Sequence, residues 1–218
     1  MFSKHKIYNY NCTIKRFSSN RIKMQKEEII RNEIIEAASL LFQQYGFQKT
    51  TMEDIAKTTG KGKSTLYYYF ANKEEVFDAV VTKEINEVFL AVNSKVTEVL
   101  TAKEKIAVFA SNYLKEVKER TNLYKIVCGE FMGNGSKLMF TLRGRNDIKE
   151  TEILKKILET GICSGEFGSI QIEDIDILSH TIVSALRGIE VDLFIDNKLP
   201  GLESRIDLII GIIVRGLH

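Results

Sequence analysis

The stretch "TTMEDIAKTTGKGKSTLYYYFANKEE", residues 50–75, decides the fold because it carries three helix signals in close succession. Thr51 stands three residues before Asp54, which is the spacing of a capping box at a helix start. Gly60 follows in the place of a C-cap glycine. Asn72 precedes Glu75 with the same capping spacing. These signals predict a short helix after Thr51, a glycine-containing turn, and a long helix that begins after Asn72.

The aromatic run between Gly62 and Phe70 is predicted to be helical, although tyrosines in sequence favour a strand by propensity alone. Leu66 and Phe70 are four residues apart, so both lie on the same face of a helix. Lys63 and Tyr67 then lie on the outer face. Two short helices joined by a glycine-containing turn make a helix-turn-helix, whose second helix can enter a DNA major groove.

The rest of the chain predicts an all-α protein. Upstream of Tyr45, from Lys26 onward, apolar residues recur every three or four positions, as in an amphipathic helix. Pro200 is the single proline, which favours long uninterrupted helices. We expect a three-helix DNA-binding domain over residues 26–73, a helical regulatory and dimerisation domain over 74–218, and a basic extension over 1–25.

The extension has two interpretations. Residues 1–26 carry cations and no acid, so they are typical of a flexible tail that adds nonspecific DNA affinity. Alternatively, Met24 is the true start and the extension is not normally translated. Its many Asn and Ser residues, together with the lack of an apolar helical stripe, predict disorder in either case.

Several classes of function are excluded by what the sequence lacks. Cys12, Cys128 and Cys163 are odd in number and widely spaced, which fits neither a disulfide framework nor a zinc site. We expect free thiols in a reducing cytoplasm, with a redox-sensing role for Cys128 or Cys163 as the alternative. No apolar run reaches the ~18 residues needed to span a membrane. We find no catalytic constellation, and we expect no enzyme activity, metal or cofactor.

Residues 27–81, and above all "LLFQQYGFQKTTMEDIAKTTGKGKSTLYYYFANKEEVFDAVV" (40–81), resemble the DNA-binding domain of the TetR family of bacterial transcriptional repressors. The resemblance implies that Thr51 and Lys73 bind phosphates and that Tyr67 contacts the DNA backbone or base edges. Lys61 and Gly62 depart from the family, which often has valine and serine there, and Ser64 replaces a common glycine. The predicted DNA-binding residues are Thr50, Thr51, Lys61, Lys63, Ser64, Thr65, Tyr67, Tyr68, Tyr69 and Lys73.

The C-terminal part resembles the family more loosely. The segment "TIVSALRGIEVDLFID" looks like the helix that commonly builds the homodimer with the last helix. An apolar stripe predicts an interface of Ile175, Leu178, Ile182, Ala185, Leu186, Ile189, Leu193, Ile206, Ile210 and Ile213. The aromatic and Met residues Phe89, Phe109, Tyr113, Tyr124, Phe131 and Met132 are candidates for a ligand cavity, with plain core as the alternative.

The sequence thus predicts a cytoplasmic, homodimeric, ligand-responsive repressor. It would leave a pseudo-palindromic double-stranded DNA operator when a small, largely apolar ligand binds. The alternative is a DNA-binding protein without small-molecule control, such as a partner-controlled or nucleoid-associated protein.

Overall fold

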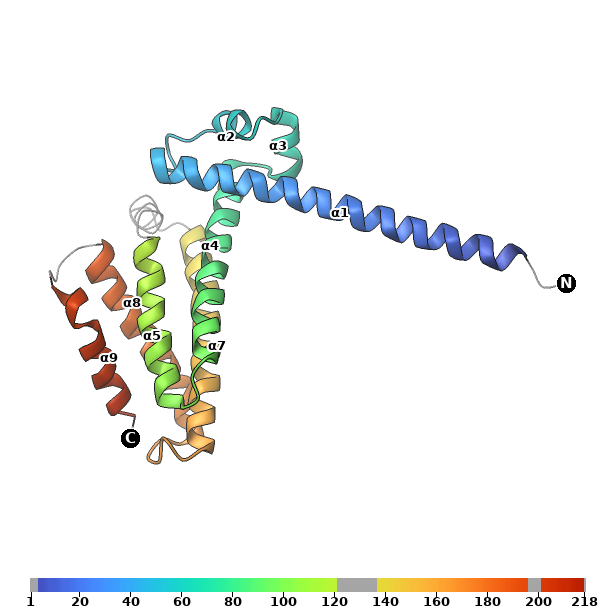
Figure 1. Ribbon diagram of the computed structural model, residues 1–218. Helices are drawn as coiled ribbons and strands as arrows, with labels where there is room; N and C mark the ends of the chain where they lie inside the picture. Colours follow the sequence, from blue (N-terminus) through green and yellow to red (C-terminus); the bar gives the residue numbers. More distant parts are fainter. Residues whose placement is uncertain (1–3, 121–136, 196–200, 218) are drawn as a thin grey trace. The chain divides into compact units, whose positions relative to one another are not determined.

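The described part of the chain is helical. The computed structural model describes residues 4–120, 137–195 and 201–217, and these contain helices, turns and no strand. The elements are α1 (Lys4–Tyr45), α2 (Met52–Thr59), α3 (Lys63–Tyr69), α4 (Lys73–Thr97), α5 (Ala102–Glu119), α7 (Lys137–Cys163), the 3-10 turn η2 (Ile172–Asp174), α8 (Ile175–Glu190), the π-helical turn η3 (Val191–Ile195), the 3-10 turn η4 (Leu202–Arg205) and α9 (Ile206–Arg215). The α-helices are labelled in Figure 1.

The chain divides into two compact units, Met1–Val80 and Val81–His218, and α4 belongs to both. We call them the N-terminal unit and the C-terminal unit. No helix among the described residues is long and apolar enough to cross a membrane.

The caps read from the sequence are confirmed in the N-terminal unit. The Thr51 hydroxyl accepts from the Asp54 N–H at 3.2 Å, and the Asp54 carboxylate accepts from the Thr51 N–H at 2.9 Å. Gly60 ends α2 in the left-handed region with φ of 65°, which favours glycine. The Asn72 side chain accepts from the Glu75 N–H at 2.8 Å at the start of α4.

An aromatic cluster fills the core of the N-terminal unit. The rings of Phe42, Phe47 and Phe77 lie 4.9–5.7 Å apart between centroids. Leu66 and Phe70 are also buried, as the helical reading of the tyrosine run predicts. The inner side of α3 is therefore fixed on the core, and its outer side is left for other contacts.

The expectation of disorder in the extension is wrong as far as the backbone is concerned, because α1 begins at Lys4 and continues to Tyr45 (Figure 1). No glycine or proline occurs before Gly46, so nothing in this stretch stops helix propagation. Positions 7, 10, 14 and 17 are also apolar at helical spacing, so the expectation that the extension lacks a helical stripe is wrong.

In the C-terminal unit, α5 packs against α7, α8 and α9, and α7 packs along α8. The loop after α7 is tied to the start of α5, where the Glu166 carboxylate accepts from the N–H groups of Ala102 and Lys103 at 3.0 and 3.2 Å. Those bonds hold the pKa of Glu166 below its usual range. Gly161 packs so closely on the Phe167 ring that an added Cβ would lie 2.1 Å from it.

Candidate nucleic-acid interface

Helix α3 carries six of the predicted DNA-binding residues, and four of them are exposed. Tyr67 is 49% exposed and Tyr68 is 71% exposed, although both are large aromatic side chains. Lys63 and Ser64 are exposed as well. The remaining two, Thr65 and Tyr69, are half-buried. Flat rings, hydroxyls and an ammonium group on one short helix suit contacts to sugar, phosphate and base edges.

Tyr69 is half-buried within its unit, and its ring packs edge-on to that of Tyr68, with ring centroids 5.0 Å apart. Burial raises the pKa of the Tyr69 phenol, and the nearby Glu27 carboxylate raises it further. The hydroxyl therefore stays protonated at neutral pH and remains a hydrogen-bond donor.

Two lysines of the predicted site already have carboxylate partners. The Lys61 ammonium lies 2.7 Å from the Glu33 carboxylate of α1. Lys63 is paired with Glu53 in the first turn of α2. The bond from Lys63 lowers the pKa of Glu53, and the same bond raises the pKa of Lys63. Both side chains stay charged at neutral pH, and any phosphate must compete with these carboxylates.

The structure corrects the prediction that Thr50 binds DNA, because this residue is only 2% exposed. Its hydroxyl donates to the Gly46 carbonyl at 2.8 Å, which ties the loop back to the end of α1. A side chain so placed supports the loop and offers little surface to DNA. Its neighbour Thr51 is exposed, so its phosphate contact stays a prediction.

Lys73 has a structural role that the sequence did not reveal. Its ammonium donates to the Phe47 carbonyl at 2.7 Å and to the Gln48 carbonyl at 3.3 Å. It also lies 4.3 Å from the centroid of the Phe47 ring, within cation–π range. Lys73 thus holds the start of α4 against the loop after α1, and its contact with phosphate stays a prediction.

The predicted ligand residues are brought together only in part. Phe109 and Tyr113 are buried on α5 and stack with ring centroids 6.2 Å apart. Phe89 is half-buried, and the Lys149 ammonium lies 5.5 Å from its ring centroid. Tyr124, Phe131 and Met132 lie outside the described residues.

A cluster of polar side chains in the C-terminal unit, three of them buried, was not predicted from the sequence. We call polar cluster the set Tyr113, Asp147, Glu150, Arg187 and Glu190, which comes from α5, α7 and α8. The Tyr113 hydroxyl donates to Glu190 at 2.8 Å, and Arg187 donates to Asp147 at 2.8 Å. The signal in the sequence is that Glu150 and Glu190 interrupt apolar stripes, before Ile153 and Leu154 and after Leu186.

Burial raises the pKa of Glu150 from 4.5 to about 8. The Arg187 guanidinium opposes this shift, whereas the carboxylates of Glu190 and Asp147 reinforce it. At neutral pH the polar cluster therefore holds Glu150 mainly in its protonated form. Its function is not assigned by any prediction made from the sequence.

The predicted dimer interface needs correction. Ile175, Ile182, Leu186 and Ile210 are buried in the core of their own chain, so they offer no surface to a partner. The partly buried residues that pack against this core are Leu178, Ile189, Leu193, Ile206 and Ile213. Ala185 is exposed, as are its neighbours on the same face of α8, namely Ile177, Thr181, Ser184 and Gly188.

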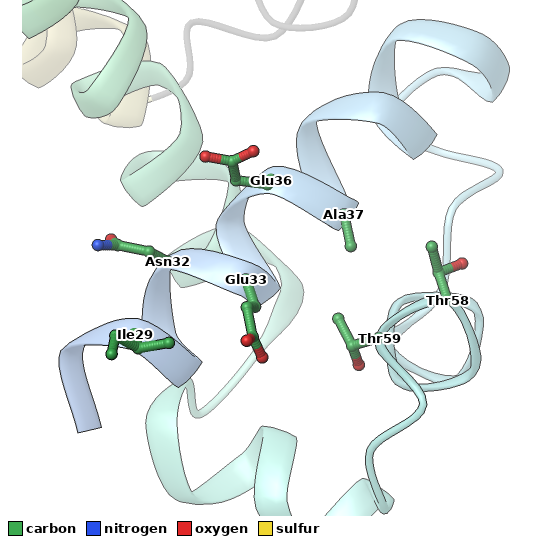
Figure 2. Close-up of a pocket in the computed structure, with 7 residues that line it drawn as sticks. All are labelled: Ile29, Asn32, Glu33, Glu36, Ala37, Thr58 and Thr59. Atoms are coloured by element: carbon green, nitrogen blue, oxygen red, sulfur yellow. The ribbon is translucent and has the colours of Figure 1, made fainter. Parts of the chain in front are cut away.

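Two surface pockets are described, one in each unit. One has a volume of about 490 Å³ and lies between α1 and the end of α2, where Glu33 and Thr59 line it (Figure 2). The other, of about 730 Å³, lies between α5 and α9 and is lined by Val108, Leu208 and Val214 among others. Of the predicted ligand residues that the structure describes, Phe89, Phe109 and Tyr113, none lines either pocket. The described residues contain no group of three or more His, Cys, Asp or Glu side chains that could hold a metal ion.

Comparisons with known proteins agree with this geometry. The profile of the family described as "Bacterial regulatory proteins, tetR family" matches residues 34–80. The uncharacterised HTH-type transcriptional regulator YhgD of Bacillus subtilis is 46% identical over 54 residues, which are 25% of this chain and 28% of that protein. The fatty acid metabolism regulator protein of B. subtilis is 29% identical over 136 residues, which are 62% of this chain and 69% of that protein.

The fold is also shared with solved structures. The crystal structure of the transcriptional regulator FadR from B. subtilis, in complex with stearoyl-CoA, aligns with a TM-score of 0.68 and 23% identity. The alignment covers 85% of this chain and 98% of that one. At this identity the likeness shows the fold alone.

Proposed function

We propose that this chain, whose residues 34–80 match the profile of the TetR family of bacterial regulatory proteins, is a transcriptional repressor that binds a pseudo-palindromic operator and is released by a small ligand. Residues 26–73 would bind DNA and residues 74–218 would carry regulation and dimerisation. The observation that carries the proposal is the exposed pair Tyr67 and Tyr68 beside Lys63, on a helix that is held to the core by the buried Leu66 and by the buried Phe70 at its C-cap. Its target would be chromosomal DNA, so its place of action would be the cytoplasm.

A homodimer through α8 and α9 fits the exposed surface of these helices. Ser184, Ala185 and Gly188 are small and lie on one exposed face of α8, so a partner helix can approach closely. On α9, Leu208 and Ile212 are more than half exposed, although both are large apolar residues. Burying such surface favours association. A two-fold symmetric dimer also matches a pseudo-palindromic operator.

The ligand would bind in the C-terminal unit beside Phe109 and Tyr113. A long acyl chain is a reasonable first ligand to test, because the B. subtilis FadR of the same fold was crystallised with stearoyl-CoA. The polar cluster adjoins this region through Tyr113, so a ligand with an apolar body and one polar group fits better than a hydrocarbon alone. The ligand must bind the DNA-free state more tightly than the DNA-bound state, since otherwise it shifts no equilibrium.

The proposal is tested by fluorescence anisotropy with duplexes from the promoter of the protein's own gene and its neighbours. The wild-type dimer should bind at least one duplex more tightly than a shuffled control. A Lys61→Gln, Lys63→Gln double variant should bind all duplexes more weakly. Stearoyl-CoA is then titrated into the complex.

Release of the DNA by stearoyl-CoA would support control by an acyl ligand. Failure with a panel of acyl thioesters and other amphipathic molecules would favour the alternative of a DNA-binding protein without small-molecule control. No preference for any promoter duplex would contradict the repressor function itself.

A further inference from the structure

Two lysines of the helix-turn-helix, Lys61 in the turn and Lys63 at the start of α3, are both engaged in ion pairs. Lys61 and Lys63 follow Gly60 within three residues, and each is paired with a glutamate of a different helix. Glu33 comes from α1 and lines the pocket between α1 and α2 (Figure 2), whereas Glu53 comes from α2. Neither glutamate serves as a helix cap, since Asp54 provides the capping carboxylate of α2.

We propose that Glu33 and Glu53 act as internal competitors of DNA phosphate, each occupying one lysine of the helix-turn-helix and so lowering its affinity for DNA. The inference rests on the proposed DNA-binding function and adds two residues that set its strength. The carboxylate oxygens offer the lysines the same kind of partner as a phosphate oxygen does. A lysine must leave its glutamate before it neutralises a phosphate. The free energy of the ion pair is therefore subtracted from the free energy of DNA binding.

The exposure of the four side chains makes this exchange feasible. Lys63 and Glu53 are 58% and 54% exposed at their side chains, so their pair can open without disturbing the core. Lys61 is 21% exposed and Glu33 is 52% exposed, so this pair has less access to solvent. Exposed ion pairs are weak enough to be displaced by a duplex that carries a dense row of phosphates.

A glutamate near the DNA surface can also act in two other ways. It can repel phosphates directly, without any involvement of the lysine, or it can hold the lysine in the geometry that phosphate binding needs. The three roles predict different results in a double-mutant cycle. A competitor acts only when its lysine is present, and its removal strengthens binding. A positioning residue also acts through the lysine, but its removal weakens binding.

The experiment measures the affinity of the full-length dimer for a fluorescent mixed-sequence duplex over a series of salt concentrations. Glu53→Gln and Glu33→Gln should each tighten binding about two- to fivefold, the range expected for the loss of an exposed ion pair. The slope of log affinity against log salt should change by much less than the roughly 0.9 of one additional phosphate contact, because the same lysines reach phosphates in the wild-type complex. Glu28→Gln, which removes an exposed charge of α1 that has no ion pair in the described structure, is the matched control and should bind as wild type.

The decisive arm combines each glutamate variant with loss of its lysine. In the Lys63→Gln background, Glu53→Gln should no longer change the affinity, and the same should hold for Glu33→Gln in the Lys61→Gln background. Tightening of equal size in both backgrounds would show direct repulsion of DNA and overturn the proposal. Weaker binding by the single glutamate variants would assign them a positioning role and overturn it as well.

Failure of the inference can be told apart from failure of the proposed function. If wild type binds the duplex and Lys63→Gln weakens it, the DNA-binding surface stands whatever the glutamates do. If the double variant Lys61→Gln, Lys63→Gln binds as tightly as wild type, the surface is elsewhere and the inference fails with it. Thermal unfolding of each variant checks that the fold is kept, as expected for substitutions at exposed side chains.

Discussion

Consecutive tyrosines on α3 differ in environment because a helix turns by about 100° per residue. Tyr67 and Tyr68 face outward, whereas Tyr69 turns partly toward the rest of its unit. The side chain before them, Leu66, is fully buried. The aromatic run is therefore not a strand and not simply core, and its exposed members are available for binding.

Replacement of Tyr67 by Ala should weaken binding of specific DNA by about 1–3 kcal/mol if the ring contacts base edges. Nonspecific binding should change little, because it depends mostly on charge. Anisotropy with specific and shuffled duplexes measures both. Tyr45→Ala removes an exposed tyrosine at the end of α1 and is the control. An equal loss for the two variants would argue against a role of Tyr67 in recognition.

Lys73 links two segments of the N-terminal unit, so its replacement should affect stability as well as DNA binding. Lys73→Met keeps the apolar stem but loses the bonds to the Phe47 and Gln48 carbonyls. Hydrogen bonds of charged groups contribute about 1.5–3 kcal/mol, and we expect the free energy of unfolding to fall by an amount in this range. Urea unfolding measures it, with Lys49→Met at an exposed lysine as control. Unchanged stability would show that the Lys73 contacts are incidental.

Glu150 should make stability depend on pH in a defined direction. Its pKa is raised to about 8 in the folded chain, against 4.5 ordinarily, so between these values the folded state holds a proton that the unfolded state lacks. The free energy of unfolding should therefore fall as pH rises from 4.5 to 8, by up to about 1.4 kcal/mol per pH unit from this group, and level off above.

Glu150→Gln removes this titration, so the difference in stability between wild type and variant should follow the same window. Urea unfolding at several pH values gives that difference. Glu159→Gln, at an exposed site on the same helix, should leave the wild-type profile unchanged. Parallel profiles of wild type and Glu150→Gln would contradict the burial argument.

At the scale of single elements, helix starts that depend on local chemistry were predictable. The capping signals at Thr51 and Asn72 involve residues three apart, and both are present in the structure. The start of α1 was not predictable from composition, because a tail rich in Asn and Ser was expected to be disordered. The absence of glycine and proline before Gly46 was the more useful signal.

The stripe on α8 shows a second limit of pattern reading. Periodicity shows that one face is apolar, but a stripe that packs within the chain has the same period as one that packs against a partner. Ile182 and Leu186 are buried within one chain, and the exposed face of α8 carries small residues instead. A small-residue face is a weaker pattern, although it suits close helix approach.

Ala185→Arg should therefore disrupt the dimer without disturbing the core of the protomer. The long charged side chain would stand on the exposed face of α8 and keep a partner helix from close approach. Light scattering at micromolar concentration should report a dimer for wild type and a monomer for the variant. Thr160→Arg places the same side chain at an exposed site on α7 and is the control. A wild-type monomer, or a dimeric Ala185→Arg variant, would contradict the proposed interface.

At the scale of the whole molecule, the sequence could predict the class of fold but not its long-range contacts. Tyr113 and Glu190 are 77 residues apart, and Asp147 and Arg187 are 40 apart. Such pairs depend on how α5, α7 and α8 pack, which no local pattern specifies. The same holds for Lys73, whose partners Phe47 and Gln48 lie about 25 residues upstream.

The proposed function assigns DNA binding to the N-terminal unit and ligand binding to the C-terminal unit. The N-terminal unit presents the exposed Tyr67 and Tyr68, and the C-terminal unit holds the buried Phe109 and Tyr113 and the polar cluster. Helix α4 contributes to both units. A ligand bound in the C-terminal unit changes DNA affinity only by as much as it prefers one state of the dimer over the other.

The most direct test of the central claim, sequence-specific DNA binding by a symmetric dimer, is selection of duplexes from a random library by the purified full-length protein. We predict enrichment of a pseudo-palindrome whose half-sites are spaced as two recognition helices of a dimer require, roughly one helical turn or a multiple of it apart. A Tyr67→Ala, Lys63→Gln double variant should lose that enrichment while it remains folded and dimeric. Recovery of sequences without a common motif, at the same level for wild type and variant, would contradict the account.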